Sequence, residues 1–214
     1  MSSKPPLFSA GFKRLEVLAI LTALGLGALY IPRLQAVGLL NIPIAFLMLL
    51  SADFLSGVAH WAFDRWGDEK TFLIGPNIIR SFREHHTDQL GITRHSFVES
   101  NGGPAMGAVP VLLMGLAIPS IYTVGLLWIG LFVVLTNVFH AWAHGKSPPR
   151  VARWLQKAGL VLGPAHHARH HKSPHDCAYC ITTGWCNPVL DYFQFWSRLE
   201  RLITATTGVE PARG

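Results

Sequence analysis

Histidine is concentrated in one short stretch near the C-terminal end of this chain, GPAHHARHHKSPH, which covers residues 163–175. Its five histidines are His166, His167, His170, His171 and His175. Two pairs among them are four residues apart, so one helix would present four imidazoles over a limited arc of its surface. Pro174 ends such a helix, and the last histidine then returns from a turn. Because histidine is the commonest side-chain ligand of transition metals, the stretch predicts a site for two adjacent metal ions.

Another pair of imidazoles is expected at the end of an apolar helix. In TNVFHAWAH, Asn137, His140 and His144 are three and four residues apart and therefore share one helical face. The H-x-x-x-H spacing allows one helix to offer two imidazoles to a single ion. The shared polar face favours a functional site over two histidines that merely meet lipid headgroups.

The stretch FREHHTD contributes the adjacent residues His85 and His86, and ITRHSF follows with His95. Adjacent histidines on a helix point about 100° apart. One of them can then bind a metal while the other orients it or faces a second ion. Alone, this pair is equally compatible with a solvated loop.

Three polar residues form a stripe along a further apolar segment. Asp53, His60 and Asp64 are separated by seven and four residues, which places them on one side of a helix. An acid inside a membrane helix is costly and usually functional. We therefore interpret the stripe as part of the site, with Asp53 the member that a headgroup contact explains least well.

These ligands suit iron, zinc or copper, because they are rich in nitrogen and poor in carboxylate. A catalytic zinc usually takes three protein ligands, and the chain has 11 histidines. Two ions with five or six ligands each would use them, which favours a dinuclear iron site that activates O2. Breaking an unactivated C–H bond of a lipid tail requires cofactor chemistry. Cys177 and Cys180 form a C-x-x-C without a second pair, which is weak evidence for a metal site.

The segments that must position these ligands resemble membrane helices. Half of the 214 residues are hydrophobic and only 14% are charged, against about 25% in soluble domains. Four apolar stretches, at about 15–31, 37–59, 105–119 and 122–139, predict four transmembrane helices, the last two forming a hairpin near Pro119 and Ser120. A cleaved signal peptide is the alternative for the first stretch, but it lacks a convincing cleavage site.

The basic residues give an orientation, since Lys and Arg beside membrane segments stay in the cytosol. The three basic clusters, before the first helix, between the second and third, and after the fourth, then fall on one side, together with both termini and all the histidines. We thus predict an all-α integral membrane protein with a cytosolic, histidine-rich cap. Residues 1–14 form a cytosolic segment, and residues 15–214 form one membrane-embedded domain. In LDYFQFWSRLERLI, Tyr192, Trp196, Leu199 and Ile203 share a face, which predicts an interfacial helix.

Taken in order, the stretches HWAFDRWG, FREHHTD, ITRHSFVESNG, HAWAH, HHARHHKSPH and YCITTGWCNP closely resemble the Kua/CarF family of lipid desaturases, over about residues 56–213. Members of this family include plasmanylethanolamine desaturase. The resemblance implies an O2-dependent enzyme with two histidine-bound iron ions that forms the 1'-alkenyl (vinyl ether) bond of plasmalogens. Ser96 stands where an acid is expected in animal members, which leaves the role of that position open.

On the matching positions, the resemblance implies ten metal ligands or essential site residues: His60, His85, His86, His140, His144, His166, His167, His170, His171 and His175. The further candidates for catalytic roles are His60 itself, Asp64, His95 and Asn137.

Three other functions remain open. Related plant members desaturate an acyl chain of a phospholipid, and a hydroxylase would use the same di-iron chemistry. Outside enzymes, the alternative is a histidine-rich metal or haem sensor, although a haem between membrane helices would require histidines within the spans. We expect an ether phospholipid as substrate, the bilayer as surroundings, no nucleic-acid partner, and an acidic electron carrier of the ferredoxin, flavodoxin or cytochrome b5 type that suits the basic face. The membrane would be a bacterial inner membrane or the endoplasmic reticulum.

Overall fold

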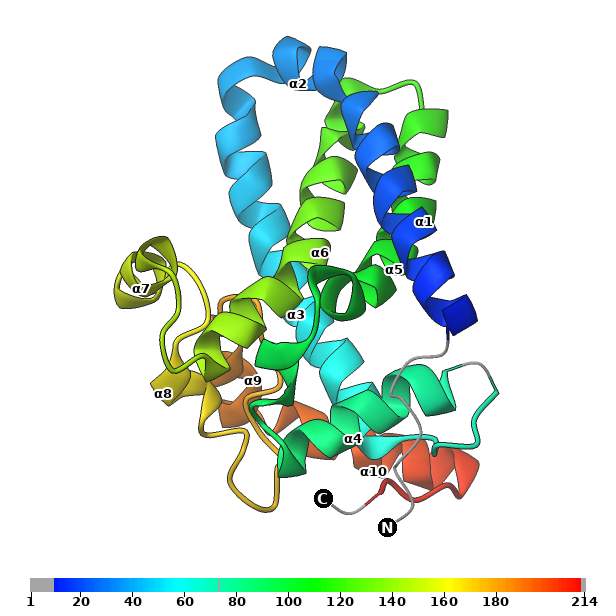
Figure 1. Ribbon diagram of the computed structural model, residues 1–214, viewed down its shortest axis with the longest axis vertical. Helices are drawn as coiled ribbons and strands as arrows, with labels where there is room; N and C mark the ends of the chain where they lie inside the picture. Colours follow the sequence, from blue (N-terminus) through cyan, green and yellow to red (C-terminus); the bar gives the residue numbers. More distant parts are fainter. Residues whose placement is uncertain (1–9, 73, 213–214) are drawn as a thin grey trace.

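The computed structural model describes residues 10–72 and 74–212, and every regular element in these two ranges is a helix. Four long helices run side by side (Figure 1): α1 (Ala10–Ala28), α3 (Asn41–Arg65), α5 (Phe97–Ala117) and α6 (Val124–His144). Helix α1 packs on α5, α5 on α6, and α6 on α3. The predicted hairpin of the third and fourth apolar stretches is therefore present, as α5 and α6.

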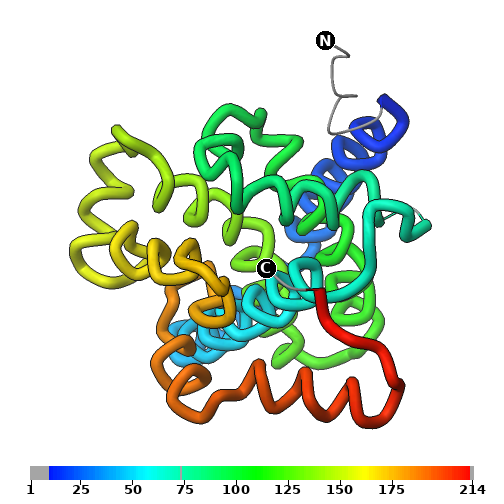
Figure 2. Tube along the Cα trace, turned by 90° about the horizontal axis from the view of Figure 1, so that it is seen from below, coloured from blue at the N-terminus to red at the C-terminus, as the bar shows by residue number. Residues whose placement is uncertain are grey.

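Short elements close both ends of this bundle. At one end lie α2 (Ile31–Val37), η1 (Gly38–Leu40) and η4 (Ile121–Thr123). The other end, seen face-on in Figure 2, carries η2 (Gly75–Ile79), α4 (Arg80–Thr87), η3 (Gly91–Arg94), α7 (Arg150–Lys157), α8 (Pro164–His167), α9 (Asn187–Tyr192) and α10 (Phe195–Thr207). The four long helices thus bring together, at this second end, short elements that are far apart in the sequence.

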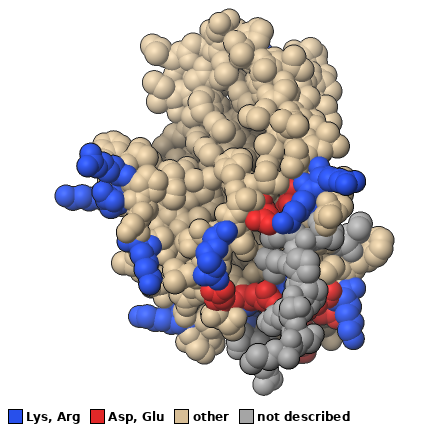
Figure 3. All heavy atoms as spheres, in the orientation of Figure 1, with Lys and Arg blue, Asp and Glu red and all other residues tan. Residues whose placement is uncertain are grey.

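Within the described part of the chain, two helical segments are long and apolar enough to cross a membrane, Ile31–Arg65 and Ile121–His144. Figure 3 shows that lysine, arginine and acidic side chains are gathered on the lower half of the molecule, whereas the visible upper half is almost free of them. Exposed side chains such as Leu24, Leu39 and Ile42 contribute to that apolar surface. This division is typical of a protein whose upper half is embedded in lipid.

Helix boundaries differ from those predicted where local hydrogen bonds extend a helix. Helix α5 begins at Phe97 rather than near residue 105, because Ser96 caps it. The Ser96 hydroxyl accepts from the Glu99 N–H at 3.3 Å, and a Glu99 carboxylate oxygen accepts from the Ser96 N–H at 2.9 Å. Pro104 and Pro110 lie inside α5 rather than ending it. Of the predicted segment 1–14, residues 1–9 lie outside the described residues, and residues 10–14 belong to α1.

Asp53 has a structural role, which corrects its interpretation as part of the site. Its side chain is completely buried in α3 and accepts four backbone N–H groups from the loop before α9. Oδ1 accepts from Thr182 at 3.2 Å, Thr183 at 2.7 Å and Gly184 at 2.8 Å, and Oδ2 accepts from Cys186 at 3.0 Å. The acid within the apolar helix therefore fastens a distant loop, and the sequence spacing alone does not reveal these partners.

The apolar face predicted for a membrane-surface helix packs against the protein instead. In α10, Trp196, Leu199 and Ile203 lie against a buried cluster that includes Trp61 of α3. Glu200 of the same helix accepts from Trp61 Nε1 at 3.0 Å and from two nitrogens of the Arg65 guanidinium at 2.7 and 3.2 Å. Tyr192, also predicted on this face, belongs to α9 and is 79% exposed. The helix is thus fixed to the end of α3.

Candidate metal centre

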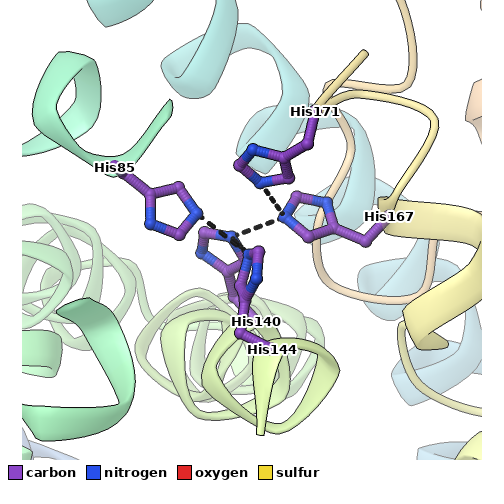
Figure 4. Close-up of side chains that lie close together, drawn as sticks. All are labelled: His85, His140, His144, His167 and His171. Carbon is purple, nitrogen blue, oxygen red and sulfur yellow. Dashed lines mark hydrogen bonds between the residues drawn. The ribbon is translucent and has the colours of Figure 1, made fainter. Parts of the chain in front are cut away.

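Five imidazoles converge where α4, α6 and α8 meet (Figure 4). The five-histidine group consists of His85, His140, His144, His167 and His171. One ligand atom from each residue lies within 4.8 Å of all the others. Helix α6 supplies two of the residues, which confirms that its H-x-x-x-H pair points to one place.

The approach between the rings is close. The Nε2 atom of His140 lies 2.8 Å from that of His167, and the Nε2 atoms of His85 and His144 are 2.9 Å apart. His171 Nε2 is 3.0 Å from the Nε2 of His167. Neutral imidazoles carry a proton on only one nitrogen, and each ring that carries it on Nδ1 points a lone pair from Nε2 toward the other rings. A cation at their centre would be a shared partner for these lone pairs.

A second group, adjacent to the first, combines three histidines with one acid: His60, Asp64, His86 and His170. Asp64 Oδ2 lies 3.0 Å from Nε2 of His86 and 3.4 Å from Nε2 of both His60 and His170. Asp64 thus lies among the candidate ligands themselves, rather than beside them. The ring centres of His86 in this group and His171 in the first are 5.5 Å apart.

Backbone carbonyls determine which nitrogen faces the second group. Nδ1 of the buried His60 lies 3.1 Å from the Tyr179 carbonyl oxygen, and Nδ1 of the buried His170 lies 2.9 Å from that of Cys177. A carbonyl can only accept, so each Nδ1 carries the proton and each Nε2 keeps a free lone pair. Neither Nε2 has a hydrogen-bond partner among the described residues. Histidine ligands are oriented in this way in metal sites, and the residues therefore fit a bound transition metal.

Neighbouring residues in the sequence serve different groups. His85 belongs to the five-histidine group and His86 to the group around Asp64, and His171 and His170 are divided in the same way. Both pairs show the geometry expected for adjacent histidines that face two ions. The single helix predicted to present the four imidazoles of residues 166–171 is only partly present, because α8 ends at His167 and the following residues form turns.

Three predicted histidines lie outside both groups. His166 Nε2 lies 3.0 Å from the side-chain amide of Asn187, and its ring covers Gly184. His175 contacts His86, with 3.1 Å between their Nδ1 atoms. His95 lines a small polar pocket beside His85 and His140.

Two residues outside the groups support the centre. Asn137, predicted on the histidine face of α6, donates from Nδ2 to the Ser100 carbonyl oxygen at 2.5 Å and lines the same polar pocket. Tyr179 was not expected in the site. Besides its carbonyl contact with His60, its hydroxyl donates to the His175 carbonyl oxygen at 2.8 Å. The only signal for this residue was its place within the YCITTGW stretch.

Burial keeps the imidazoles of the five-histidine group neutral. The pKa of His171 is lowered to about 2, first by burial and then by the neighbouring imidazoles. The same causes lower the pKa of His85 and of His167 far below the usual value for histidine. Neutral imidazoles bind metals without first losing a proton, so the five-histidine group is prepared for a cation at neutral pH.

Comparison with known proteins agrees with this geometry. The family described as "Lipid desaturase domain" matches residues 49–213, which include every residue of both groups. The chain belongs to the lipid desaturase family. No solved structure matches it.

Three relatives of this desaturase carry informative names. It is 38% identical to a protein of Myxococcus xanthus named plasmanylethanolamine desaturase, over 95% of this chain and 76% of that protein. It is 40% identical to mouse plasmanylethanolamine desaturase 1, over 76% of this chain and 64% of that protein. It is 39% identical to the chloroplastic fatty acid desaturase 4 of Arabidopsis thaliana, over 75% of this chain and 50% of that protein. The chain thus spans less than two thirds of the length of the mouse and plant relatives.

Proposed function

We propose that this desaturase forms the vinyl ether bond of plasmalogens, removing two hydrogens from C1' and C2' of the 1-O-alkyl chain of plasmanylethanolamine with O2 as co-substrate. The observation that carries the proposal is the convergence of imidazole nitrogens in two adjacent groups, the second of which contains the unpartnered Nε2 atoms of His60 and His170. The names of the M. xanthus and mouse relatives support the substrate.

The two groups are proposed to hold one iron ion each. The first ion would be bound by the five-histidine group, and the second by His60, Asp64, His86 and His170. His175, which contacts His86, is retained as a further candidate ligand of the second ion. His166 is assigned a supporting role, because its Nε2 is taken up by Asn187. Bound iron would supply the activation of O2 that cleavage of an unactivated C–H bond requires.

The protein contributes position and exclusion of water. Tyr179 and the Cys177 carbonyl fix the rings of His60 and His170. Asn137 and His95 border the pocket that reaches His85 and His140, and we propose that they contact the substrate near the reacting carbons. In the overall reaction O2 accepts four electrons and becomes two water molecules. Two electrons leave with the substrate hydrogens, and two come from an external carrier together with two protons from solvent.

The topology we propose has four transmembrane helices, α1, α3, α5 and α6, within one membrane-embedded domain of residues 15–214. The apolar surface of the upper half and the charged lower half support this arrangement. The histidine groups and both termini would then face the cytosol, in a bacterial inner membrane or the endoplasmic reticulum. The basic side chains around that end suit an acidic electron carrier of the ferredoxin, flavodoxin or cytochrome b5 type.

Expression in a host that contains plasmanyl lipids but makes no plasmalogen tests the proposal. We expect acid-labile vinyl ether lipids, detected by mass spectrometry, from the wild-type chain and none from a His167→Ala variant that still reaches the membrane. A new double bond in an acyl chain, with no vinyl ether, would instead assign the activity named for the Arabidopsis relative. A hydroxylated chain would assign the hydroxylase alternative.

A further inference from the structure

A large, partly open apolar cavity lies beside the histidine groups, lined mainly by residues of α1, α3, α5 and α6. Its volume is about 590 Å³, within the range of about 300–1,000 Å³ that ligand sites occupy. Its walls are mainly apolar, with side chains such as Leu55, Phe63 and Val133. The cavity is therefore suited to a hydrocarbon chain.

The polar residues of the cavity lie at the end nearest the histidines. Ser81, Phe82, Glu99, Ser100 and Asn137 line both this cavity and the small polar pocket that reaches His85 and His140. The far end, in contrast, is formed by residues such as Met114 and Leu126. An amphiphile in this cavity would thus place its polar end beside the metal centre and its chain away from it.

Glu16 adds a hydrogen-bonding requirement at the polar end. Glu16 lines the cavity and is only 1% exposed. It packs closely on Gly102 of α5, because a Cβ built on Gly102 would lie 2.2 Å from the Cβ of Glu16. Its Oε2 has no hydrogen-bond partner in residues 10–72 and 74–212. A buried oxygen without a donor is costly. The ammonium group of an ethanolamine lipid offers such a donor.

The length of the cavity corresponds to a whole lipid chain. It extends along α5 from Ser100 to Met114, which is about 21 Å at 1.5 Å per residue. One leaflet of a bilayer has a hydrocarbon thickness of about 15 Å, half of the total. A full-length alkyl chain can therefore lie along this cavity.

Two glycines of α5 keep this space open. Gly103 and Gly107 are one turn apart and line the cavity, and a Cβ built on either meets no atom of the described residues within 4 Å. They thus differ from Gly102, where a Cβ has no room. A larger side chain at Gly103 or Gly107 would therefore occupy the cavity without disturbing the packing of α5.

We propose that this cavity holds the 1-O-alkyl chain of the substrate, and that Gly103 and Gly107 determine which chain lengths are accepted. The assignment of the occupant as a 1-O-alkyl chain rests on the proposed function, whereas the existence of a lipid-binding site is inferred from the cavity itself. The position of a side chain along α5 then determines how much of the cavity remains for the alkyl chain. A side chain at Gly103 obstructs the cavity near the metal centre, one at Gly107 cuts it short, and one at Val111 shortens it least.

The test offers plasmanylethanolamines with short and long alkyl chains in one mixture and compares vinyl ether products. We expect Gly107→Leu to lower the ratio of long-chain to short-chain product at least about tenfold, since single methylene differences in apolar pockets are worth that much. Val111→Phe should shift the ratio less, and Gly103→Leu should abolish conversion of every chain. Gly25→Leu is the matched control, because Gly25 is exposed on α1, has no atom within 4 Å of a built Cβ, and does not line the cavity.

Iron content, measured on the same samples, separates obstruction of the cavity from misfolding. If Gly107→Leu loses its iron, Gly107→Ala replaces it, since one methyl group enters open space and should disfavour only the longest chains. A wild-type ratio in an iron-containing Gly107 variant would overturn the proposal. Absence of vinyl ether from the wild-type chain would instead overturn the proposed function and leave the cavity to be tested with the lipid that is converted.

Discussion

Asp53 allows a stability prediction that depends on distant contacts. In Asp53→Asn, the amide oxygen can replace Oδ1 and keep the N–H groups of Thr182, Thr183 and Gly184, but Cys186 N–H then faces an NH2 group. Three charge-assisted hydrogen bonds become neutral ones, which lowers the free energy of unfolding by about 1 kcal/mol each. One buried N–H loses its acceptor, which lowers it further, by about 1–3 kcal/mol. We expect a loss of about 4–6 kcal/mol in the free energy of unfolding.

In Asp53→Ala, all four N–H groups lose their acceptor, which costs about 4–12 kcal/mol by the same values. This is comparable to the whole stability of a domain, about 5–15 kcal/mol. We therefore expect Asp53→Ala to fold poorly and Asp53→Asn to fold with a much lower thermal midpoint. The loop also leads to Tyr179, so iron should be released at lower temperature as well.

The thermal midpoint of each variant is measured in detergent, and the temperature at which iron is released is recorded in the same experiment. Ser51→Ala is the matched control on the same helix, because the Ser51 hydroxyl donates to the Leu47 carbonyl oxygen of its own helix, at 3.0 Å, rather than to a distant loop. It should change stability by no more than about 0.5 kcal/mol. An Asp53→Asn protein as stable as Ser51→Ala would refute the assignment of Asp53 as the acceptor for this loop.

Three further outcomes are expected. His166→Ala should keep the wild-type iron content and lose about 1 kcal/mol of stability with the Asn187 contact; loss of an iron ion would return His166 to the ligands. Glu200→Gln should speed proteolysis of α10, because Arg65 and Trp61 lose a charged acceptor worth about 1–3 kcal/mol, and unchanged cleavage would contradict that anchor. Metal-free protein should lose stability as pH falls below about 6.5, since the unfolded chain takes up protons that His171, with its pKa lowered to about 2, and His85 refuse when folded. A thermal midpoint that is constant from pH 7 to pH 5 would contradict the neutral cluster.

The sequence predicted the helical class and the gathering of histidines at one end because both follow from local patterns. Apolar runs indicate helices, and basic flanks indicate which ends lie together. The H-x-x-x-H pair on α6 also converges as its spacing implies. What failed was the assumption of one helix through residues 166–171, since α8 stops at His167 and turns direct His170 and His171 to different groups.

The remaining errors concern contacts between distant segments, which spacing does not encode. Asp53 shares a helical stripe with His60 and Asp64, yet its partners come from a loop about 130 residues away. The same is true of the apolar face of α10, which packs in a cluster with Trp61 of α3. The apolar cavity depends on where α1 and α5 stand relative to α3, and no motif in the sequence marks it.

The presence of two separate metal sites is tested most directly by the iron content of the protein. Purified, iron-loaded wild-type protein should contain about two iron ions per chain, because the two groups supply nine ligands. His144→Ala removes a ligand from the first group and His170→Ala one from the second, and each variant should retain the iron of the other group. One zinc ion per chain and no iron would contradict a site in which each group binds its own ion. So would single variants that each lose both iron ions, or that each lose neither.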